Sequence, residues 1–482
     1  MTEPQPAPKS LVAALVFLGL FLGLWGIRWG LPARARLVRM LPPGLESPAF
    51  HRALADSWSA MHAELGENMT VNPLAWRGGV TGVIETPAGW KIPPQELLNS
   101  YRSFYLRSEH EDEQSTLLAL SGMKPRQLQF NPHLFIYGTP YIYSVGAALA
   151  AGTVTGLISL KSSVLFYLAD PAKMGAMYLT GRLVSVAAFV GCGLMLLRLG
   201  RRYLGLEAGA VAAAIFLMTP AAVVQAHLLK NHMFWAFFAL WTMDRCALVL
   251  KRGTLKDYAA AGAVAGMTVA SFLGAWTTCF VVGITGAMRL SGLHEPGGRP
   301  QKALPELQGL LLAGVCAGAA FLLINPYWIL DFKMAMQEMA VLRSAATIQL
   351  ANPLLFIQNG LRLSVTDSIV TLMFGGAVLA LIRGRREPVL LLCAIVFLSA
   401  LVSTMMFSNV LAARSVRYFL GWAGVGSLLA GRLLQEMRTL KGPAGKFATA
   451  GTAIVLVGLL CQGMTYAHNF SLGEGVKSNH FK

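Results

Sequence analysis

Charged residues are scarce in this chain. Lys, Arg, Asp and Glu make up 13% of its 482 residues, whereas an ordinary soluble protein carries about 25%. Because 55% of the residues are hydrophobic, a soluble fold of this composition would have too little polar surface to cover its core. The scarcity of charge therefore excludes an ordinary soluble enzyme and favours a protein embedded in a membrane.

Acidic residues are the scarcer kind of charge. The chain has 23 Asp and Glu against 40 Lys and Arg, which gives a net charge of +17. In a soluble protein this excess would suggest a nucleic-acid partner. In a membrane protein, basic residues gather in the short cytoplasmic loops. We adopt the second explanation and expect no nucleic-acid partner.

Cysteine pairs with the spacing of a zinc or redox site are also missing. None of the six cysteines forms a Cys-x-x-Cys pair, and all of them lie in or beside apolar runs. They are therefore predicted to be small core residues rather than metal ligands or disulfides. These residues are Cys192, Cys246, Cys279, Cys316, Cys393 and Cys461.

Apolar runs long enough to cross a bilayer recur along the chain. A crossing takes roughly 20 residues as a helix, and lipid offers the backbone no hydrogen-bond partner, so these runs must be helical. The first run follows Lys9 with no small-residue cleavage site after it, which predicts a retained membrane helix. The other runs are 134–157, 175–197, 206–224, 232–250, 258–275, 277–290, 307–324, 364–382, 388–406, 415–432 and 448–466. The predicted fold is an all-α polytopic membrane protein with about 11–13 transmembrane helices.

Clusters of basic residues predict which helix ends face the cytoplasm. Such clusters surround Arg201, Lys251, Arg385 and Arg438, and they alternate correctly with the intervening helices. The long polar segment after the first helix is then extracytoplasmic. Its length of about a hundred residues is far above that of usual loops, and such loops are commonly functional.

The chain is predicted to be one membrane domain, residues 1–482. Its parts are an extracytoplasmic loop with an acidic motif at 28–133, a transmembrane helix bundle at 134–466 and a C-terminal tail at 467–482. The segment 134–157 does not fit the alternation as a single crossing. It is therefore either re-entrant or paired with a second short crossing at 161–170.

The densest charged cluster is Glu109-His110-Glu111-Asp112-Glu113, in the long loop. Four carboxylates around one histidine are costly to hold together unless they are solvated, bound to a metal or sharing protons. A solvated acidic turn is one interpretation. Because the cluster comes just before a membrane segment, it is also suited to supply a general base or to hold a cation.

Two further polar groups interrupt the apolar runs. His133 and Tyr137 belong to a Tyr-rich stretch that is either an interfacial belt or the lining of a sugar pocket. His227, Lys230 and His232 lie between two apolar runs, either as a functional cluster at membrane depth or as a helix end that reaches the interface. The two histidines are five residues apart, unlike a zinc pair, which is four residues apart on one helical face.

Two more groups follow later in the chain. Asn325-Pro-Tyr327 ends an apolar run, and the proline is expected to break its helix. Arg414 and Arg417, followed by Tyr418, precede a late helix. Arginine suits phosphate because of its fixed charge and forked donors, although an interfacial anchor is the alternative. Under the charge-derived topology, all of these groups lie on one side of the membrane.

In their order these motifs resemble the GT-C glycosyltransferases, in the branch of the protein mannosyltransferases and aminoarabinose transferases. His110-Glu111-Asp112-Glu113 is similar to the acidic motif of the first outer loop, and LSGMKPRQLQFNPHLFIYGTPYIY resembles the Pro-rich aromatic stretch that follows it. Later matches are Gly181-Arg182-Leu183, Asn325-Pro-Tyr327 and Arg417-Tyr418. The resemblance covers roughly residues 10–432, and the series of motifs is more specific than any one of them.

One motif departs from the family pattern. Many relatives carry His-x-x-x-x-Asp where this chain has His227 and then His232. A second carboxylate for catalysis or metal binding is therefore missing at this position, and Lys230 is expected to meet the donor phosphate instead. No metal ligand or cofactor is assigned, and a role for a divalent cation is left open.

The resemblance implies inverting transfer of a sugar from a polyprenyl-phosphate donor to an extracytoplasmic glycan, lipid or protein. The implied catalytic residues are Asp112, as general base, and Glu113, which supports it or binds the acceptor. The implied cations that stabilise the donor phosphate are Lys230, Arg417 and Arg182. The predicted substrate-binding residues are His133, Tyr137, His227, His232, Asn325 and Tyr327.

The resemblance also implies a location and leaves two alternatives. We expect a multi-pass protein of the inner (plasma) membrane, in contact with membrane lipids, with its active site on the extracytoplasmic side and the polyprenyl tail between helices. A lipid or solute transporter is the first alternative, although no clear half-to-half repeat of the kind found in transporters is present. A noncatalytic GT-C-like assembly subunit is the second, because His232 replaces an acidic residue.

Overall fold

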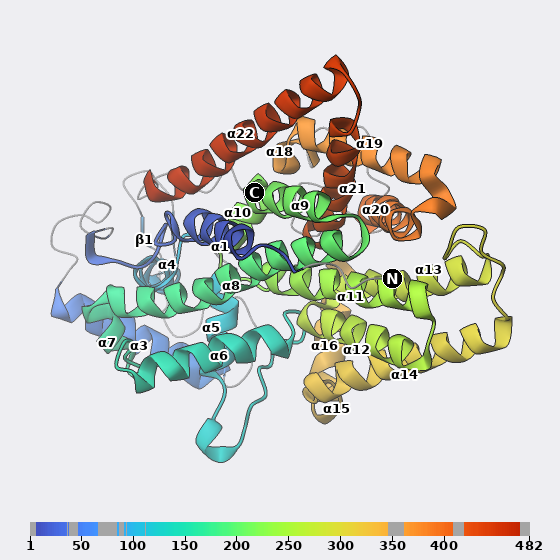
Figure 1. Ribbon diagram of the computed structural model, residues 1–482. Coiled ribbons are helices and arrows are strands. Elements are labelled where there is room, and N and C mark those ends of the chain that lie inside the picture. The colour runs from blue at the N-terminus through green and yellow to red at the C-terminus, as the bar shows by residue number, and fades with distance from the viewer. Residues whose placement is uncertain are drawn as a thin grey trace.

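The computed structural model describes residues 6–35, 37, 47–65, 84–85, 91–92, 94–110, 112–345, 361–407 and 419–472. Within these residues the fold is almost entirely helical (Figure 1). Strands β1 (Ile84–Glu85) and β2 (Lys91–Ile92) form a short antiparallel pair in the first long loop. The all-α prediction is confirmed.

Six helices of the described chain are long and apolar enough to cross a membrane. They are α8 (Pro171–Tyr203), α11 (His232–Arg252), α13 (Thr278–Leu290) with the preceding turn η2 (Leu273–Thr277), α14 (Ala303–Ile324), α19 (Asp367–Arg383) with the following turn η4 (Gly384–Arg386), and α22 (Pro443–Leu472). Helices α9 (Leu206–Met218) and α10 (Pro220–Ala226) add a seventh if they form one span, bent by 63°. The chain is therefore a multi-pass membrane protein.

The remaining apolar runs are helices too, but they are shorter or less apolar. They are α1 (Lys9–Leu24), α6 (Thr139–Val154), α12 (Leu255–Ser271), α20 (Pro388–Phe407) and α21 (Leu420–Arg438). Every predicted run thus contains a helix. Length and composition single out six or seven as candidate spans, where the apolar runs alone predicted about 11–13.

Helix α6 forms most of the segment whose topology the sequence left open. It runs beside the first half of α8, where the Tyr141 hydroxyl lies 3.2 Å from Ser185 Oγ (Figure 1). Between the two helices, α7 (Val164–Ala169) has only six residues, which rise about 9 Å. That is too short for the second crossing considered at 161–170.

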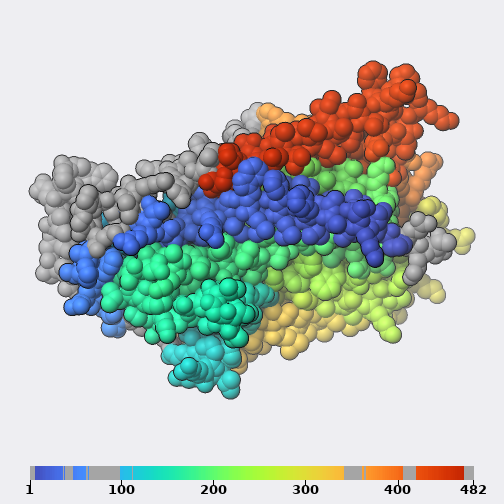
Figure 2. Space-filling view, turned by 60° about the vertical axis from the view of Figure 1, so that its left-hand side comes forward, coloured from blue at the N-terminus to red at the C-terminus, as the bar shows by residue number. Residues whose placement is uncertain are grey.

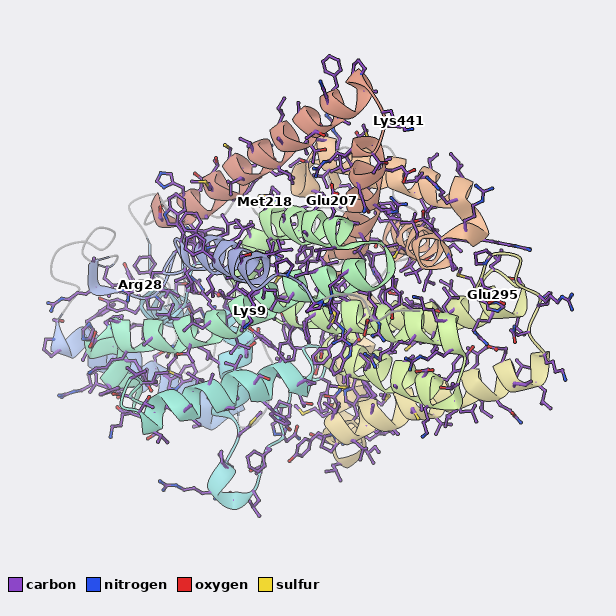
Figure 3. The ribbon with its side chains drawn as sticks, viewed as in Figure 1. Lys9, Arg28, Glu207, Met218, Glu295 and Lys441 are labelled. Carbon is purple, nitrogen blue, oxygen red and sulfur yellow. The ribbon has the colours of Figure 1, made fainter. Side chains whose placement is uncertain are left out.

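Helices of the long first loop gather at the end of the molecule where α8 begins (Figure 1). They are α3 (Pro48–Leu65), α4 (Pro94–Leu106) and α5 (Glu113–Ser121), followed by the turn η1 (Pro125–Gln127). Leu54 of α3, Tyr105 of α4 and Leu168 of α7 share one small apolar core. Arg28 marks this end in Figure 3, and Glu295 marks the opposite end.

The helices differ in how deeply they are buried. The apolar part of α11 is 78% buried, whereas that of α14 is 11% buried and that of α22 is 17% buried. Because α14 and α22 expose mostly apolar side chains, they are suited to face lipid. Figure 2 shows α1 as a band on the surface between α22 and α8.

Glycine lets the most closely packed helices approach. An added Cβ at Gly262 of α12 would lie 2.0 Å from the carbonyl oxygen of Ala313 in α14, and one at Gly266 would lie 2.2 Å from that of Ala317. Small residues four apart on both helices therefore bring the two backbones into contact, as is common in membranes.

Beyond α14 the chain turns at Asn325-Pro326 into α15 (Tyr327–Leu330) and α16 (Phe332–Ala345). Helix α18 (Arg362–Val365) then leads into α19. The proline breaks the helix as predicted, and this turn brings α15 and α16 against the loop before α6.

Candidate active site

Asp112 and Lys230 meet although 118 residues separate them. Lys230 Nζ donates a hydrogen bond to Asp112 Oδ2. The Lys230 side chain is 2% exposed and that of Asp112 is 35% exposed. The pair therefore consists of a buried ammonium beneath a carboxylate that solvent and substrates can reach.

Glu113, the next residue, is fully buried and held on both carboxylate oxygens. Arg182 donates to it from Nε over 2.8 Å and from Nη2 over 2.7 Å. The Leu229 backbone N–H adds a third bond of 2.6 Å. Burial alone would raise the pKa of Glu113, but the Arg182 charge and these hydrogen bonds outweigh it and hold the pKa below its usual value.

Arg182, from the middle of α8, has no exposed surface. Its Nη1 donates to the carbonyl oxygens of Ile27 and Trp29, each over 2.7 Å. A guanidinium has five N–H donors, and four of them are directed at these carbonyls and at Glu113. The structure thus favours a role for Arg182 in holding Glu113 and the chain after α1, rather than the predicted contact with a phosphate.

The backbone that carries Lys230 is fixed from two sides. Leu229 is bound by Glu113, and Ser185 Oγ of α8 donates to the Leu228 carbonyl oxygen over 2.7 Å. Asn231 then donates from Nδ2 to the carbonyl oxygens of Tyr137, at 2.9 Å, and Ser271, at 3.0 Å. Lys230 therefore projects from a short, rigid connection between α10 and α11.

The two predicted histidines lie inside the walls of the site. His227 Nδ1 is 2.7 Å from the Val223 carbonyl oxygen and Nε2 is 2.9 Å from that of Trp25. Its ring also stacks on Phe470, with 4.3 Å between the ring centres. His232 is 2% exposed and meets the Phe272 ring edge to face. These positions favour packing roles for both side chains over the predicted contact with substrate.

Asn325 links three helices. Its Oδ1 accepts from the Thr139 backbone N–H at 3.0 Å, and its Nδ2 donates to the Ala270 carbonyl oxygen at 3.2 Å. Because Asn231 binds the next carbonyl, that of Ser271, the ends of α6, α12 and α14 join beside Lys230. Asn325 is 2% exposed, so the structure places this predicted substrate-binding residue in a structural link.

Of the other predicted residues, His133 and Tyr137 lie on the loop before α6, and Tyr327 begins α15. The Phe130 backbone N–H donates to the Tyr327 hydroxyl over 3.1 Å. His133 is half-buried, with Nδ1 3.5 Å from Asp331 Oδ2, and Tyr137 is half-buried and offers its carbonyl to Asn231. The contacts of Phe130 and His133 therefore tie this loop to α15 and to Asp331.

Sequence reasoning missed two polar residues of this region. Ser185 fixes the Leu228 carbonyl, and Glu338 of α16 accepts the backbone N–H groups of Phe135 at 2.8 Å and Ile136 at 3.1 Å. Glu338 has one signal in the sequence, because it is one of only two carboxylates, with Asp331, in the stretch 325–340. Ser185 has none.

Several predicted residues lie outside the described part of the chain. These are Glu111, Arg414, Arg417 and Tyr418. Within the described part, no three His, Cys, Asp or Glu side chains lie together in a way that could hold a metal ion.

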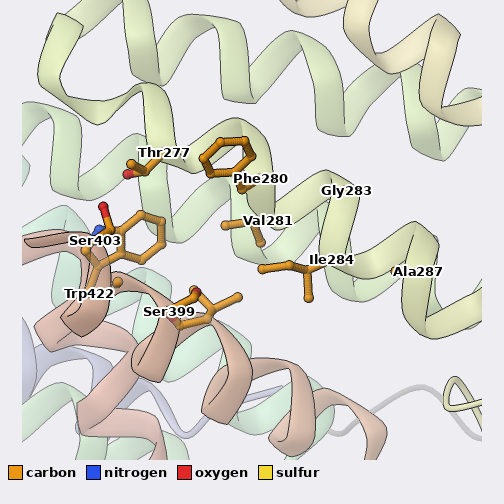
Figure 4. Close-up of a pocket in the computed structure, with 11 residues that line it drawn as sticks. Thr277, Phe280, Val281, Gly283, Ile284, Ala287, Ser399, Ser403 and Trp422 are labelled. Carbon is orange, nitrogen blue, oxygen red and sulfur yellow. The ribbon is translucent and has the colours of Figure 1, made fainter. Parts of the chain in front are cut away.

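An apolar groove of about 470 Å³ lies between α13, α20 and α21 (Figure 4). Thr277, Ser403 and Trp422 line one end, and Ala287 lies at the other. Asp112 and Lys230 do not line it. Ring contacts connect the two places, because Trp422 meets Trp235, Trp235 meets Phe272, and Phe272 meets His232, at centroid distances of 6.4, 6.1 and 5.4 Å.

No family model and no curated protein matches the sequence. Among solved structures, ArnT from Cupriavidus metallidurans bound to undecaprenyl phosphate aligns with 14% identity and a TM-score of 0.45, over 76% of this chain and 72% of that one. The archaeal oligosaccharyltransferase AglB from Archaeoglobus fulgidus, in complex with an inhibitory peptide and a dolichol-phosphate, aligns with 12% identity and a TM-score of 0.46. That alignment covers 88% of this chain and 56% of the other.

The likeness to these two solved structures is one of fold alone. At identities of 12–14% and TM-scores below 0.5, the similarity does not establish a donor, an acceptor or a mechanism for this chain.

Proposed function

We propose that this chain is a membrane glycosyltransferase that transfers a sugar from a polyprenyl-phosphate donor to an extracytoplasmic acceptor, with inversion at the anomeric carbon. The acceptor hydroxyl gives its proton to Asp112, and its oxygen forms the new bond to the anomeric carbon. The bond between that carbon and the phosphate oxygen breaks, and its electron pair leaves with the phosphate. Lys230 stabilises the charge that develops there.

The Asp112–Lys230 pair is the observation that carries this proposal. A general base must be reachable by its substrate, and Asp112 is 35% exposed. A cation stabilises a leaving phosphate best where water is excluded, and Lys230 is 2% exposed. The two groups are in direct contact, so an acceptor and a phosphate bound on either side of the pair would lie close enough to react.

Glu113 and Arg182 support this pair without touching substrate. Glu113 directly follows Asp112 in the chain. It also accepts a hydrogen bond from the backbone N–H of Leu229, the residue directly before Lys230. One buried carboxylate thereby sets the position of both the proposed base and the proposed cation. We therefore assign Glu113 and Arg182 as positioning residues.

The apolar groove supports a polyprenyl donor. It is open between helices and is lined mainly by apolar side chains (Figure 4). Its Trp422 end leads through ring contacts to His232, two residues from Lys230. An isoprenoid chain is apolar and flexible, so it gains free energy by leaving water for such a groove. We propose that the groove holds the part of the tail nearest the phosphate.

The charge distribution supports an extracytoplasmic site. Arg201 and Arg202 end α8, and Lys251 and Arg252 end α11. Both pairs lie at the opposite ends of their helices from Asp112 and Lys230. Since basic helix ends face the cytoplasm, the proposed site faces outward.

Substitution of the proposed base tests the reaction. The purified chain in proteoliposomes is given a polyprenyl-phosphate sugar, and transfer is measured alongside the binding of undecaprenyl phosphate. Asp112→Asn is expected to slow transfer by about 100-fold or more while binding changes by less than about threefold. Lys230→Met is expected to weaken both. Asp170→Asn, at the surface ion pair with Lys173, is the matched control and should change neither.

Each other outcome points to a different function. Wild-type-like transfer by Asp112→Asn would remove the assignment of the base. Movement of the lipid across the vesicle without sugar transfer would support a transporter. Binding of undecaprenyl phosphate without transfer by the wild-type chain would support a noncatalytic assembly subunit.

Filling the groove tests the donor separately. A Cβ added at Gly283, which lines the groove, has no atom within 4 Å, and the same holds for Gly314 on α14. Gly283→Phe is expected to weaken undecaprenyl phosphate binding about tenfold because the ring occupies the groove. Gly314→Phe should leave it unchanged. Equal effects of the two variants would place the lipid elsewhere.

A further inference from the structure

A second charged cluster lies at the far end of the same two helices. It centres on Asp244 of α11, whose side chain is fully buried. Arg245 Nη2 lies 2.6 Å and Arg198 Nη2 3.3 Å from Asp244 Oδ2, and Arg202 Nη1 lies 3.7 Å from Oδ1. Arg198 is 16 residues beyond Arg182 on α8, a rise of about 24 Å, so this cluster is separate from the candidate active site.

The cluster carries far more positive than negative charge. A fourth cation, Lys251, lies 4.6 Å from the centre of the Tyr203 ring, and Arg202 lies 5.5 Å from the same ring. Three arginines thus pair with one carboxylate and Lys251 lies on the ring beside them, so these five groups carry a net charge of +3. Within the described chain the ion pairs of Arg198, Arg202 and Arg245 all end on Asp244.

Neutralising Asp244 does not by itself account for this arrangement. One arginine would balance a single buried carboxylate, and each further cation adds repulsion from like charges held close together. The three guanidinium groups are also partly open to the outside, with exposed fractions of 47% for Arg198, 28% for Arg202 and 23% for Arg245. Their remaining donors are therefore accessible to an anion from outside the protein.

The surroundings of the cluster indicate what kind of anion it binds. On α11, Phe237, Trp241 and Arg245 follow one another at intervals of four residues, so they share one face of the helix. The rings of Phe237 and Trp241 are half-buried and 6.3 Å apart. An apolar strip thus leads away from the guanidinium groups along a helix that is long and apolar enough to cross a membrane.

We propose that this cluster binds the phosphodiester headgroup of an anionic phospholipid, with an acyl chain along the Phe237–Trp241 strip. An ion that consists of phosphate alone would use the guanidinium groups but not the strip. Each basic group at the membrane surface raises the binding constant for an anionic lipid about fivefold. The site is independent of the proposed sugar transfer and gives the chain a preference for lipids on the side opposite to the candidate active site.

Quenching by brominated lipids tests the proposal, because Trp241 lies one helical turn from Arg245. The full chain is reconstituted in phosphatidylcholine vesicles that contain either brominated phosphatidylglycerol or brominated phosphatidylcholine. The Trp241 signal is the difference between the wild-type chain and Trp241→Phe. Brominated phosphatidylglycerol is expected to quench it with a binding constant at least about tenfold higher than brominated phosphatidylcholine.

Substitution of the exposed arginines gives the decisive comparison. Arg198→Gln should lower the preference for phosphatidylglycerol about fivefold, and the double variant with Arg202→Gln should remove it. The double variant Arg385→Gln and Arg386→Gln removes the same charge from the exposed turn η4 and should keep the preference. If the first double variant unfolds more easily, the single variant, at the most exposed of the three arginines, still gives the test.

Three results would overturn the proposal. The first is a preference that survives in the Arg198→Gln and Arg202→Gln variant. The second is an equal loss in the Arg385→Gln and Arg386→Gln variant, which would reduce the effect to overall charge. The third is complete displacement of the lipid by inorganic phosphate, which would identify the ligand as the free anion.

Discussion

Replacing Glu113 by Gln tests whether the buried ion pair with Arg182 holds the candidate active site together. Both side chains are fully buried and joined by two hydrogen bonds of 2.7 and 2.8 Å. Glutamine keeps the shape but leaves the Arg182 charge without its partner, which in a buried pair costs about 3–5 kcal/mol. With an unfolding entropy of about 2 cal/mol/K per residue, a chain of this length shifts its melting temperature by about 1 °C per kcal/mol. We expect Glu113→Gln to lower Tm by about 3–5 °C.

The chain supplies both an assay and a matched control. Cys192, Cys246 and Cys393 are buried free thiols, so a thiol-reactive dye reports unfolding in detergent. Arg432 also binds both oxygens of a carboxylate, that of Glu387, at 2.7 and 2.9 Å, but these side chains are 14% and 20% exposed. Glu387→Gln should therefore lower Tm by about 1 °C or less. Equal shifts for the two variants would refute the reasoning that burial sets the cost.

The pH dependence of the same variant follows from the direction of the Glu113 pKa. The folded-state pKa lies below the ordinary value of 4.5, so the carboxylate contributes its full stability above about pH 4.5. That contribution is lost as the pH falls further, through the folded-state pKa. The difference in Tm between the wild-type chain and Glu113→Gln should therefore be constant near neutral pH and shrink on acidification. A difference that grows on acidification would contradict the sign.

Two further predictions concern the packing that positions the site. Gly262→Leu should destabilise the chain by about 2 kcal/mol or more, because its Cβ would meet the Ala313 carbonyl oxygen at 2.0 Å. Gly314→Leu is the control, because a Cβ added at Gly314 has no atom within 4 Å. Equal melting temperatures for the two variants would contradict the close packing of α12 and α14. Asn325→Ala should cost about 1–3 kcal/mol because the Thr139 N–H and the Ala270 carbonyl lose a buried partner, and protection of the Thr139 amide from hydrogen exchange should fall with it. Unchanged exchange at Thr139 would show that Asn325 does not hold α6.

The sequence predicted different things about the helices and about the site. Every apolar run contains a helix, since in lipid a backbone can satisfy its hydrogen bonds only within the segment itself. That rule does not fix length, so the sequence could not foresee that α6, α12 and α1 have only 16 or 17 residues. Nor did it show that α7 has six residues and cannot cross.

For the site, the sequence named residues that the structure brings together, but it did not show which of them contact one another. It named Asp112, Glu113, Arg182 and Lys230, and the structure brings these four together. It expected Arg182 to meet a phosphate, whereas the structure directs that side chain at Glu113 and at two backbone carbonyls. A charged residue in an apolar run has the same appearance in sequence whether its partner is a ligand or another buried side chain.

The sequence by itself determined that this chain is a helical membrane protein, because composition and apolar run length are properties of the chain alone. It also singled out the rare charged and polar groups between the apolar runs. Only the tertiary structure decided which of those groups meet. The Asp112–Lys230 pair spans 118 residues and the Glu113–Arg182 pair spans 69. Contacts at such separations depend on how the helices pack, and a stripe of small residues shows that a helix packs closely without showing which helix it packs against.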